Sequence, residues 1–178
     1  MDANALRELQ APLKDRYRKE PEAALITLKA KGSLDEGIAC KVETGRAIAL
    51  AGLHPATGGS GHELCSGDML LEALVACSGV TLRAVATALG LNVKSGRVEA
   101  EGDLDFRGTL GVDKEAPVGF QSIRLKFHLD TNEPQEKIDQ LLKLTERYCV
   151  VLQTIRNSVE ASAEVVRGKF PLPASGER

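Results

Sequence analysis

The chain has 178 residues, 3% aromatic side chains, no tryptophan and a formal net charge of −2 at pH 7. This length is enough for one domain with a real hydrophobic core, and the charge gives no electrostatic reason to expect a nucleic acid or an anionic membrane as partner. The scarcity of aromatic residues argues against stacking platforms for sugars or single strands. The first residues lack the basic and apolar regions of a signal peptide, so we expect a cytoplasmic protein whose four cysteines are reduced.

The N-terminal third predicts one helix and three short strands. Residues Asn4–Glu20 carry apolar side chains at helical spacing among charges, which is typical of an amphipathic helix. Alternating segments at Ala24–Lys31, Gly37–Glu43 and Arg46–Leu53 are separated by turn residues and predict an antiparallel meander.

A long apolar segment, Gly67–Leu89, predicts the central helix of the fold. It is apolar nearly all round, which is typical of a helix buried on most sides. It is also close to membrane-spanning length, but charges at Asp68, Glu72 and Arg83 interrupt it, and each would be costly inside a bilayer. We therefore expect a core helix of a soluble protein. The irregular loop His54–Cys65 precedes it.

The C-terminal half alternates between strand and helix patterns. Asn92–Phe106 and Phe120–Leu129 predict strands, and in the second the apolar and polar residues alternate cleanly. Gln135–Glu146 and Tyr148–Asn157 predict helices, and Glu160–Val166 predicts a closing strand. The order of elements predicts an α+β fold with antiparallel sheet.

The segments divide into three parts. We expect an N-terminal amphipathic helix in residues 1–23, one α+β domain in residues 24–166, and a disordered tail rich in proline, glycine and serine in residues 167–178.

Cys77 and Cys149 lie on apolar helices that must share one core. Two thiols on facing helices can meet, which would give a functional pair; the alternative is that both are inert, small apolar core residues. Glu146 and Arg147 lie within one turn of Cys149 and offer charge that could tune its thiol.

For the remaining two cysteines the sequence gives weaker indications of a functional role. Cys65 comes directly before the central helix, where the helix dipole could lower the pKa of a thiol, although an ordinary loop cysteine is the simpler interpretation. Cys40 lies in a predicted strand and is expected in the core.

Metal, cofactor and hydrolase sites are not indicated. His54, His62 and Cys65 share one loop, but their spacing matches no familiar zinc pattern and a fourth ligand is missing. Gly58–Gly61 lacks the spacing and the lysine of a phosphate-binding loop, and no Ser stands in a G-x-S-x-G context. His128 lies on the polar side of its strand and is expected in solvent. We expect no metal and no cofactor.

Three stretches resemble a known family. They are LAGLHPATGG (residues 50–59), DMLLEALVACSGVTLRAVA (68–86) and LTERYCVVLQTI (144–155), the last two carrying the paired cysteines. Over residues 24–166 the chain resembles the OsmC/Ohr family, that is, osmotically inducible protein C and organic hydroperoxide resistance protein.

The resemblance implies an α+β fold with antiparallel sheets and a long central helix, assembled as an intertwined homodimer. It also implies a thiol-dependent peroxidase of the peroxiredoxin type that acts in stress defence. Cys77 would attack an organic hydroperoxide and become a sulfenic acid, and Cys149 would resolve it to a disulfide, which a dithiol such as a lipoyl group would reduce. The alternative is a non-peroxidatic OsmC-like protein that binds small molecules; a metal-binding protein is a distant third.

The chain departs from the family pattern near the cysteines. The residue after the second cysteine is Val150 where the family usually has proline, and Ser66 and Asp68 stand about where it has proline and glutamate. The peroxidases of the family hold the thiolate with an arginine from the early strands, and Arg46 is the nearest equivalent here.

Overall fold

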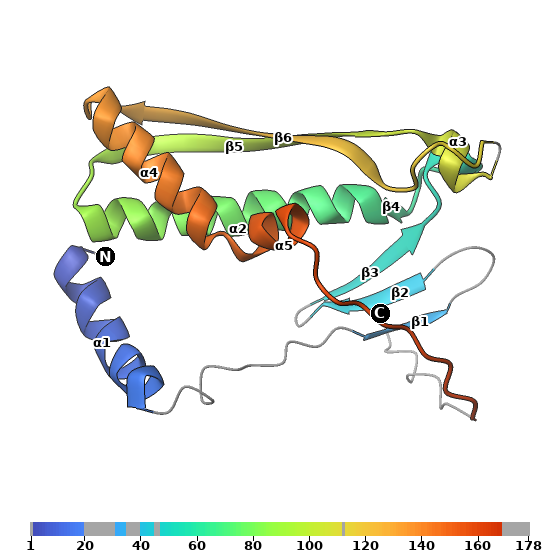
Figure 1. The fold of residues 1–178 in the computed structure, drawn as a ribbon, viewed down its shortest axis with the longest axis horizontal. Helices are drawn as coiled ribbons and strands as arrows, with labels where there is room; N and C mark the ends of the chain where they lie inside the picture. Colours follow the sequence, from blue (N-terminus) through green and yellow to red (C-terminus); the bar gives the residue numbers. More distant parts are fainter. Residues whose placement is uncertain (1, 20–30, 35–39, 45–46, 112, 169–178) are drawn as a thin grey trace. The chain divides into compact units, whose positions relative to one another are not determined.

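A computed structural model describes most of the chain (Figure 1), namely residues 2–19, 31–34, 40–44, 47–111 and 113–168. The chain forms two compact units. One comprises residues 1–28 and 70–157, and the other comprises residues 29–69 and 158–178. The first unit contains both Cys77 and Cys149.

The N-terminal helix α1 spans Ala3–Lys19, in agreement with the helix predicted at Asn4–Glu20. Its first turn is capped by Asp2, whose Oδ1 accepts a hydrogen bond of 2.9 Å from the Ala5 amide. A side-chain oxygen in this position satisfies one of the amides that have no partner within the helix.

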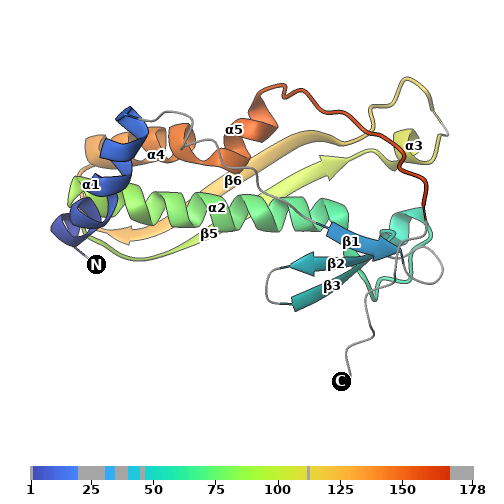
Figure 2. The same ribbon diagram turned by 90° about the horizontal axis from the view of Figure 1, so that it is seen from below.

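The second unit contains a four-stranded sheet with the order β1-β2-β3-β4 (Figure 2). The strands are β1 (Lys31–Leu34), β2 (Cys40–Thr44), β3 (Ala47–Gly52) and β4 (Leu64–Cys65). The first three are antiparallel, as predicted, and β4 runs parallel to β3. The sequence placed the first strand at Ala24–Lys31 and a turn directly after it. Most of that predicted strand lies outside the described residues, and Gly32–Leu34 form strand instead of turn.

The loop between β3 and β4 contains a short 3-10 helix, η2 (Pro55–Thr57). Gly58 ends it with a φ of +91°, a conformation that glycine adopts without strain. At Gly59 a Cβ atom would lie only 1.6 Å from the Leu53 carbonyl oxygen, so only glycine fits there. These glycines therefore serve the local packing of the loop.

Helix α2 (Ser66–Leu89) has 24 residues and corresponds to the helix predicted at Gly67–Leu89. Its buried residues form a single stripe at four-residue spacing: Leu74, Ser78, Leu82 and Ala86. Val80, on the opposite side, is 73% exposed. The expectation that the helix is buried on most sides is therefore wrong for the single chain. By length and composition α2 could also cross a membrane, a criterion that core helices of soluble proteins meet as well.

The two long strands β5 (Val93–Leu104) and β6 (Phe120–Thr131) pair as an antiparallel ribbon, joined through the short helix α3 (Phe106–Thr109). The alternation predicted for Phe120–Leu129 is confirmed: Ile123, Leu125, Phe127 and Leu129 are half-buried, and the residues between them are exposed.

The exposed side of this ribbon carries ion pairs between the strands. Arg124 pairs with Asp103, and Lys126 Nζ lies 3.2 Å from Glu101 Oε2. The hydrogen bonds from Arg124 and Ser122 hold the pKa of Asp103 well below its usual range. His128 is exposed, as expected, and its Nε2 lies 3.0 Å from Glu99 Oε2. These contacts reinforce the pairing register of the strands.

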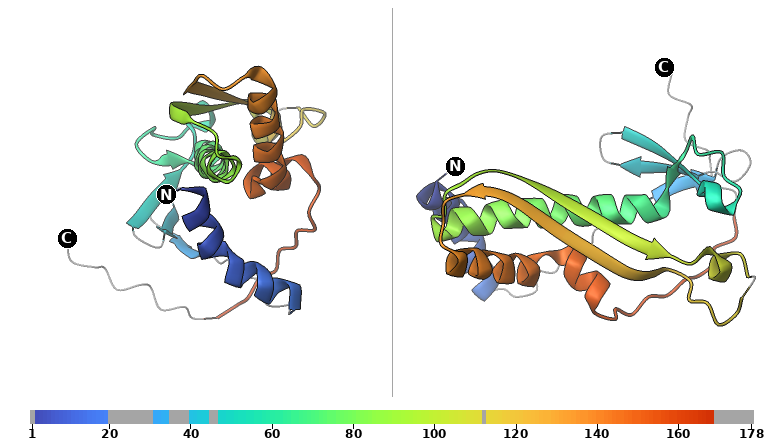
Figure 3. Two further views of the ribbon diagram at one scale, coloured as in Figure 1. Left: turned by 90° about the vertical axis from the view of Figure 1, so that its left-hand side faces the viewer. Right: turned by 90° about the horizontal axis from the view of Figure 1, so that it is seen from above.

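Helices α4 (Gln135–Tyr148) and α5 (Val150–Arg156) follow, close to their predicted positions. Figure 3 shows α2 and the α4–α5 pair side by side on one face of the β5–β6 ribbon. Their apolar side chains meet in two clusters. One contains Leu82, Ala86, Val93 and Leu141, and the other contains Leu74, Cys149 and Leu152.

The closing strand predicted at Glu160–Val166 is wrong. Residues 158–166 have no regular secondary structure, and Val165 is 87% exposed. Alternation of apolar residues predicts a strand only where a sheet offers a partner and a face to bury, and within the described residues no strand pairs with this segment.

Candidate active site

Cys77 and Cys149 come together in the second of the two apolar clusters. Cys77 lies in the middle of α2 and is half-buried, and it packs against the cluster that contains the fully buried Cys149. The two thiols are close enough for each to shift the pKa of the other. The structure therefore brings together the two cysteines that the sequence singled out.

Cys149 owes its position to a break between two helices. It is the C-cap of α4 and the N-cap of α5, with an extended backbone at φ −72° and ψ 105°. Its own amide donates to the Thr145 carbonyl, and its carbonyl accepts from the Gln153 amide at 2.9 Å. The amides of the first turn of α5 have no acceptor within the helix, and they lie next to the two thiols.

These amides affect the ionisation of Cys77. Burial raises the pKa of its thiol, but the backbone amides of Val151 and Val150 and the thiol of Cys149 donate hydrogen bonds to the sulfur, and the net effect lowers the pKa. Hydrogen bonds to a charged form favour that form. Cys77 is therefore the thiol of the pair that ionises more readily.

Thr81, one turn after Cys77, also contributes. Its hydroxyl is a hydrogen-bond partner of the Cys77 sulfur and lowers the thiol pKa further. The same hydroxyl lies 2.8 Å from the Cys77 carbonyl oxygen as a donor, so its single proton is divided between that oxygen and the sulfur, and its effect on the thiol is the smallest of the causes. The residue-by-residue interpretation of the sequence missed Thr81, although its spacing of four residues from Cys77 on a helix was a signal.

Cys149 has the opposite shift. Burial raises the pKa of its thiol most, the Leu152 amide lowers it, and the neighbouring Cys77 raises it again. The pair is thus asymmetric, with Cys77 favoured as thiolate and Cys149 as thiol. A thiolate is the nucleophilic form of cysteine, so Cys77 is the better nucleophile of the two.

The charges expected to tune Cys149 have other partners. Glu146 Oε2 accepts a hydrogen bond of 2.9 Å from Arg156, and the Arg147 guanidinium lies 5.6 Å from the centre of the Tyr148 ring. The main contributions to the Cys149 pKa come from burial, a backbone amide and Cys77. The tuning role predicted for Glu146 and Arg147 is therefore wrong.

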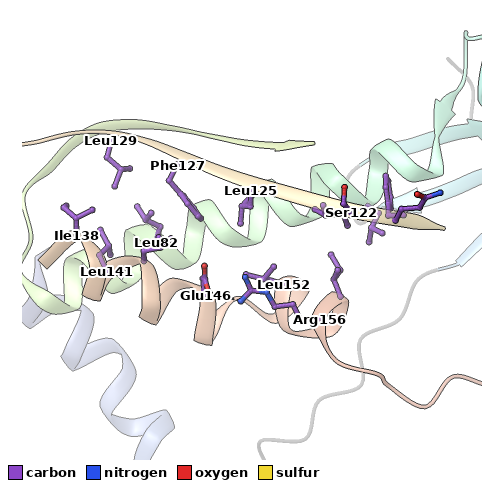
Figure 4. Close-up of a pocket in the computed structure, with 16 residues that line it drawn as sticks. Leu82, Ser122, Leu125, Phe127, Leu129, Ile138, Leu141, Glu146, Leu152 and Arg156 are labelled. Atoms are coloured by element: carbon purple, nitrogen blue, oxygen red, sulfur yellow. Dashed lines mark hydrogen bonds and ion pairs between the residues drawn. The ribbon is translucent and has the colours of Figure 1, made fainter. Parts of the chain in front are cut away.

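An elongated cavity of about 720 Å³ lies beside the thiol pair, within the same unit (Figure 4). Most of its lining is apolar and comes from α2, β6, α4 and α5: Leu70, Leu82, Phe120, Gln121, Ser122, Ile123, Leu125, Phe127, Leu129, Ile138, Leu141, Leu142, Glu146, Leu152, Ile155 and Arg156. Leu152, Leu125 and Ile155 also pack around the cysteines. The cavity and the thiols thus share a wall of side chains.

The other candidate residues form no second site in the described part of the chain. His54 Nδ1 accepts from the Ala56 amide and caps η2. His54, His62 and Cys65 do not gather into a metal site, and no group of three such ligands occurs among the described residues. Cys65 is a half-buried free thiol on β4. Cys40 lies on β2, and its side chain, like Arg46, is outside what the structure describes.

Two comparisons with known proteins bear on the family of this chain. The family model described as OsmC-like protein matches residues 59–164, more than half of the chain. A search among curated proteins finds no significant match.

Several solved structures share the fold at low sequence identity. An OsmC like protein from Mycoplasma pneumoniae superposes with a TM-score of 0.62 at 14% identity and covers 74% of this chain and 88% of its own. An organic hydroperoxide resistance protein OsmC from Legionella pneumophila gives a TM-score of 0.59 at 19% identity, with coverage of 75% and 91%. An organic hydroperoxide resistance protein from Elizabethkingia anophelis, with thiocyanate bound, gives 0.57 at 15%, with coverage of 77% and 93%.

Proposed function

The chain belongs to the OsmC-like family, and from this premise we propose that it reduces organic hydroperoxides with Cys77 and Cys149 as its redox pair. One observation carries the proposal. Cys77 packs against the cluster that contains the buried Cys149, and the pKa values of the two thiols are shifted in opposite directions. A lowered pKa suits Cys77 to the attack, because the thiolate is the nucleophile, and a neighbouring thiol can condense with the sulfenic acid that forms.

The first step uses the Cys77 thiolate as nucleophile. Its sulfur attacks the terminal oxygen of the hydroperoxide and the O–O bond breaks. The alkoxide leaves with the bonding electron pair and takes up a proton from solvent to become an alcohol. Cys77 is now a sulfenic acid, so the substrate has been reduced by two electrons and the sulfur oxidised by two.

The second step protects the enzyme. The Cys149 sulfur attacks the Cys77 sulfur and forms a disulfide. The hydroxyl group leaves, takes up the proton that Cys149 gives up, and departs as water. Prompt disulfide formation prevents further oxidation to the irreversible sulfinic acid. A dithiol such as a lipoyl group would then supply two electrons to restore both thiols.

The apolar surroundings favour organic over inorganic peroxide. The cavity that shares a wall with the thiols is lined mainly by leucine, isoleucine and phenylalanine. An alkyl or acyl chain gains free energy by leaving water for such a cavity, whereas hydrogen peroxide has no apolar part to bury.

The decisive experiment treats the reduced protein with one equivalent of cumene hydroperoxide and maps its peptides by mass spectrometry. We expect a Cys77–Cys149 disulfide, and its absence would refute the proposal. Cys77→Ser should remove both the disulfide and steady turnover with a dithiol reductant. Cys65→Ser is the matched control, because this half-buried thiol lies on β4 rather than in the thiol cluster.

The second candidate is a non-peroxidatic OsmC-like protein that binds small molecules. The size and apolar lining of the cavity favour it, because they suit a ligand whether or not the thiols react. Steady peroxide turnover that is lost in Cys77→Ser would exclude this function. For both candidates we propose action in the cytoplasm, where reduced thiols persist, and as a homodimer.

A further inference from the structure

The bend between α4 and α5 deprives one carbonyl group of its helical partner. In a continuous helix the Glu146 carbonyl would accept a hydrogen bond from the amide of Val150, four residues later. Cys149 lies between the two helices with an extended backbone, which ends the helical series of bonds (Figure 1). The Glu146 carbonyl instead accepts a hydrogen bond of 2.7 Å from Nε2 of the Gln153 side chain. A side-chain amide thus takes the place of a backbone amide.

The Gln153 side chain is itself held in position. Asn157 Nδ2 donates to Gln153 Oε1 at 3.1 Å and to the Gln153 carbonyl at 2.8 Å. Because Asn157 uses the oxygen of the side-chain amide, the nitrogen, which is the donor, is presented to Glu146. Arg156 adds a second link across the bend, to Glu146 Oε2 at 2.9 Å. Side chains of α5 therefore reach back to the last turn of α4 and hold the bend closed.

The bend also determines which groups the first amides of α5 can reach. In a continuous helix the amides of Val150 and Val151 would bind carbonyls of the preceding turn. Here Val151 packs against the cluster that contains Cys149, as Cys77 does. Burial raises the pKa of the Cys77 thiol, and both amides lower it, together with the Cys149 thiol and the Thr81 hydroxyl. None of these groups is a charged side chain, so the backbone amides matter for the thiol.

We propose that Gln153 is a positioning residue of the thiol pair. It occupies the Glu146 carbonyl, and so leaves the Val150 amide to the sulfur of Cys77. Without Gln153 this carbonyl would lack a partner, which is costly for a polar group that is removed from water. The donor that a helix would supply is the Val150 amide, so the bend would relax towards a continuous helix. This inference rests on the proposed function for its role in catalysis, but its effect on the thiol is measurable without peroxide.

Gln153→Met tests the inference, because methionine has a similar length and no donor. We expect the alkylation of Cys77 by iodoacetamide to reach half its maximal rate at a higher pH than in the wild type, and to be slower at neutral pH. A loss of packing alone would not move this pH profile in a set direction. A midpoint equal to that of the wild type would overturn the inference.

The matched control makes the same substitution at the other end of α4. Gln135 Nε2 donates to Asp139 Oδ1 at 2.8 Å on the exposed first turn of that helix. Gln135→Met therefore also removes a side-chain amide and one hydrogen bond, and it should leave the Cys77 midpoint unchanged. An equal shift in Gln135→Met and Gln153→Met would overturn the inference.

A double variant separates positioning from general stability. Val150→Pro leaves no N–H for the Glu146 carbonyl to bind. Adding Gln153→Met to Val150→Pro should therefore shift the Cys77 midpoint much less than Gln153→Met does in the wild-type background. Equal shifts in the two backgrounds would show that Gln153 does not act through the Val150 amide and would overturn the inference.

The wild-type protein offers a test that does not depend on the folding of any variant. Heteronuclear NMR follows the backbone amides of Val150 and Val151 while the Cys77 thiol is titrated, and both should shift with the midpoint of its alkylation. Amides that do not follow this titration would overturn the inference even if Gln153→Met failed to fold. Disulfide formation with cumene hydroperoxide in such a protein would leave the proposed function standing. Slower alkylation in Gln153→Met, with no peroxide turnover by the wild type, would support the inference and refute the proposed function.

Discussion

Cys77 packs against the apolar cluster that contains Cys149 although 149 − 77 = 72 residues separate the two in the sequence. The β5–β6 ribbon occupies most of that interval and returns the chain so that α4 and α5 lie beside α2. The break at Cys149 then directs the first amides of α5 towards Cys77. The Cys77 thiol and the backbone amides that lower its pKa thus come from helices that are far apart in the sequence.

The lowered pKa of Cys77 predicts how the rate of its alkylation depends on pH. Only the thiolate reacts with iodoacetamide, and a lowered pKa retains thiolate at lower pH. The alkylation rate of Cys77 should therefore reach half its maximum below the value of about 8.5 that is usual for cysteine. The alkylation rate of Cys149 should reach half its maximum at a higher pH than is usual for cysteine, because burial and the neighbouring Cys77 raise its pKa. Peptide mass spectrometry after timed alkylation measures both profiles, and a Cys77 midpoint at or above the usual value would contradict the assignment.

Val150→Pro tests the role of the backbone. Proline fits the first turn of a helix but has no N–H, so the variant removes the Val150 hydrogen bond to the Cys77 sulfur. We expect the pKa of Cys77 to rise and its alkylation at neutral pH to slow, because a hydrogen bond to the charged form of a group favours that form.

The matched control for this change is Val150→Ala, which keeps the amide and removes a side chain that is 69% exposed. It should leave the alkylation profile unchanged. An equal shift in both variants would mean that the side chain, and not the N–H group, acts on the thiol. The test is pertinent because the family to which the chain belongs usually has proline at this position and an arginine on the thiolate.

Thr81→Val removes a hydroxyl with little change of shape. The Thr81 hydroxyl lowers the Cys77 pKa and is the smallest of the causes. Its loss should therefore raise that pKa and slow alkylation at neutral pH, by less than the loss of a backbone amide does. Thr81→Ser keeps the hydroxyl and should behave as wild type. A slower reaction in both variants would indicate a packing effect instead.

The sequence was sufficient to predict most of the secondary structure and that Cys77 and Cys149 lie in one apolar core. Alternation along Phe120–Leu129 and the helical pattern of Gln135–Glu146 depend on local periodicity, and both elements formed close to the predicted bounds. The predicted strand Glu160–Val166 shows where periodicity is not enough, because a strand also needs a partner. The two-residue strand β4 is too short to give a pattern at all.

The groups that lower the pKa of Cys77 could not be predicted from sequence patterns. The amides of Val150 and Val151 donate whatever their side chains are, so no residue type signals them. The pairing of Glu146 with Arg156 required the bend at Cys149, since the two residues are ten positions apart and on different helices. Charges close to Cys149 in sequence therefore suggested a tuning role that the fold does not give them.

Leu74 is expected to be critical for stability. It is fully buried in the cluster with Cys149 and Leu152. Leu74→Ala leaves a cavity there and should lower the free energy of unfolding by about 2–5 kcal/mol. Val80→Ala, on the exposed side of the same helix, should cost far less. Urea denaturation followed by circular dichroism compares the two, and similar losses would mean that Val80 is also buried in the native assembly.

The exposed side of α2 predicts a homodimer. Ala73, Ala76 and Val80 lie there in solvent, opposite the buried stripe, and Val80 is 73% exposed. An apolar stripe of this kind on a long helix would gain roughly 25 cal/mol per Å² if a second copy covered it. Light scattering at low micromolar concentration should give about twice the chain mass of 19.0 kDa. Val80→Glu should shift this mass towards the monomer. Val118→Glu, at a site that is 74% exposed but lies in the loop before β6, should not. A cooperatively folded wild-type monomer at this concentration would refute the dimer.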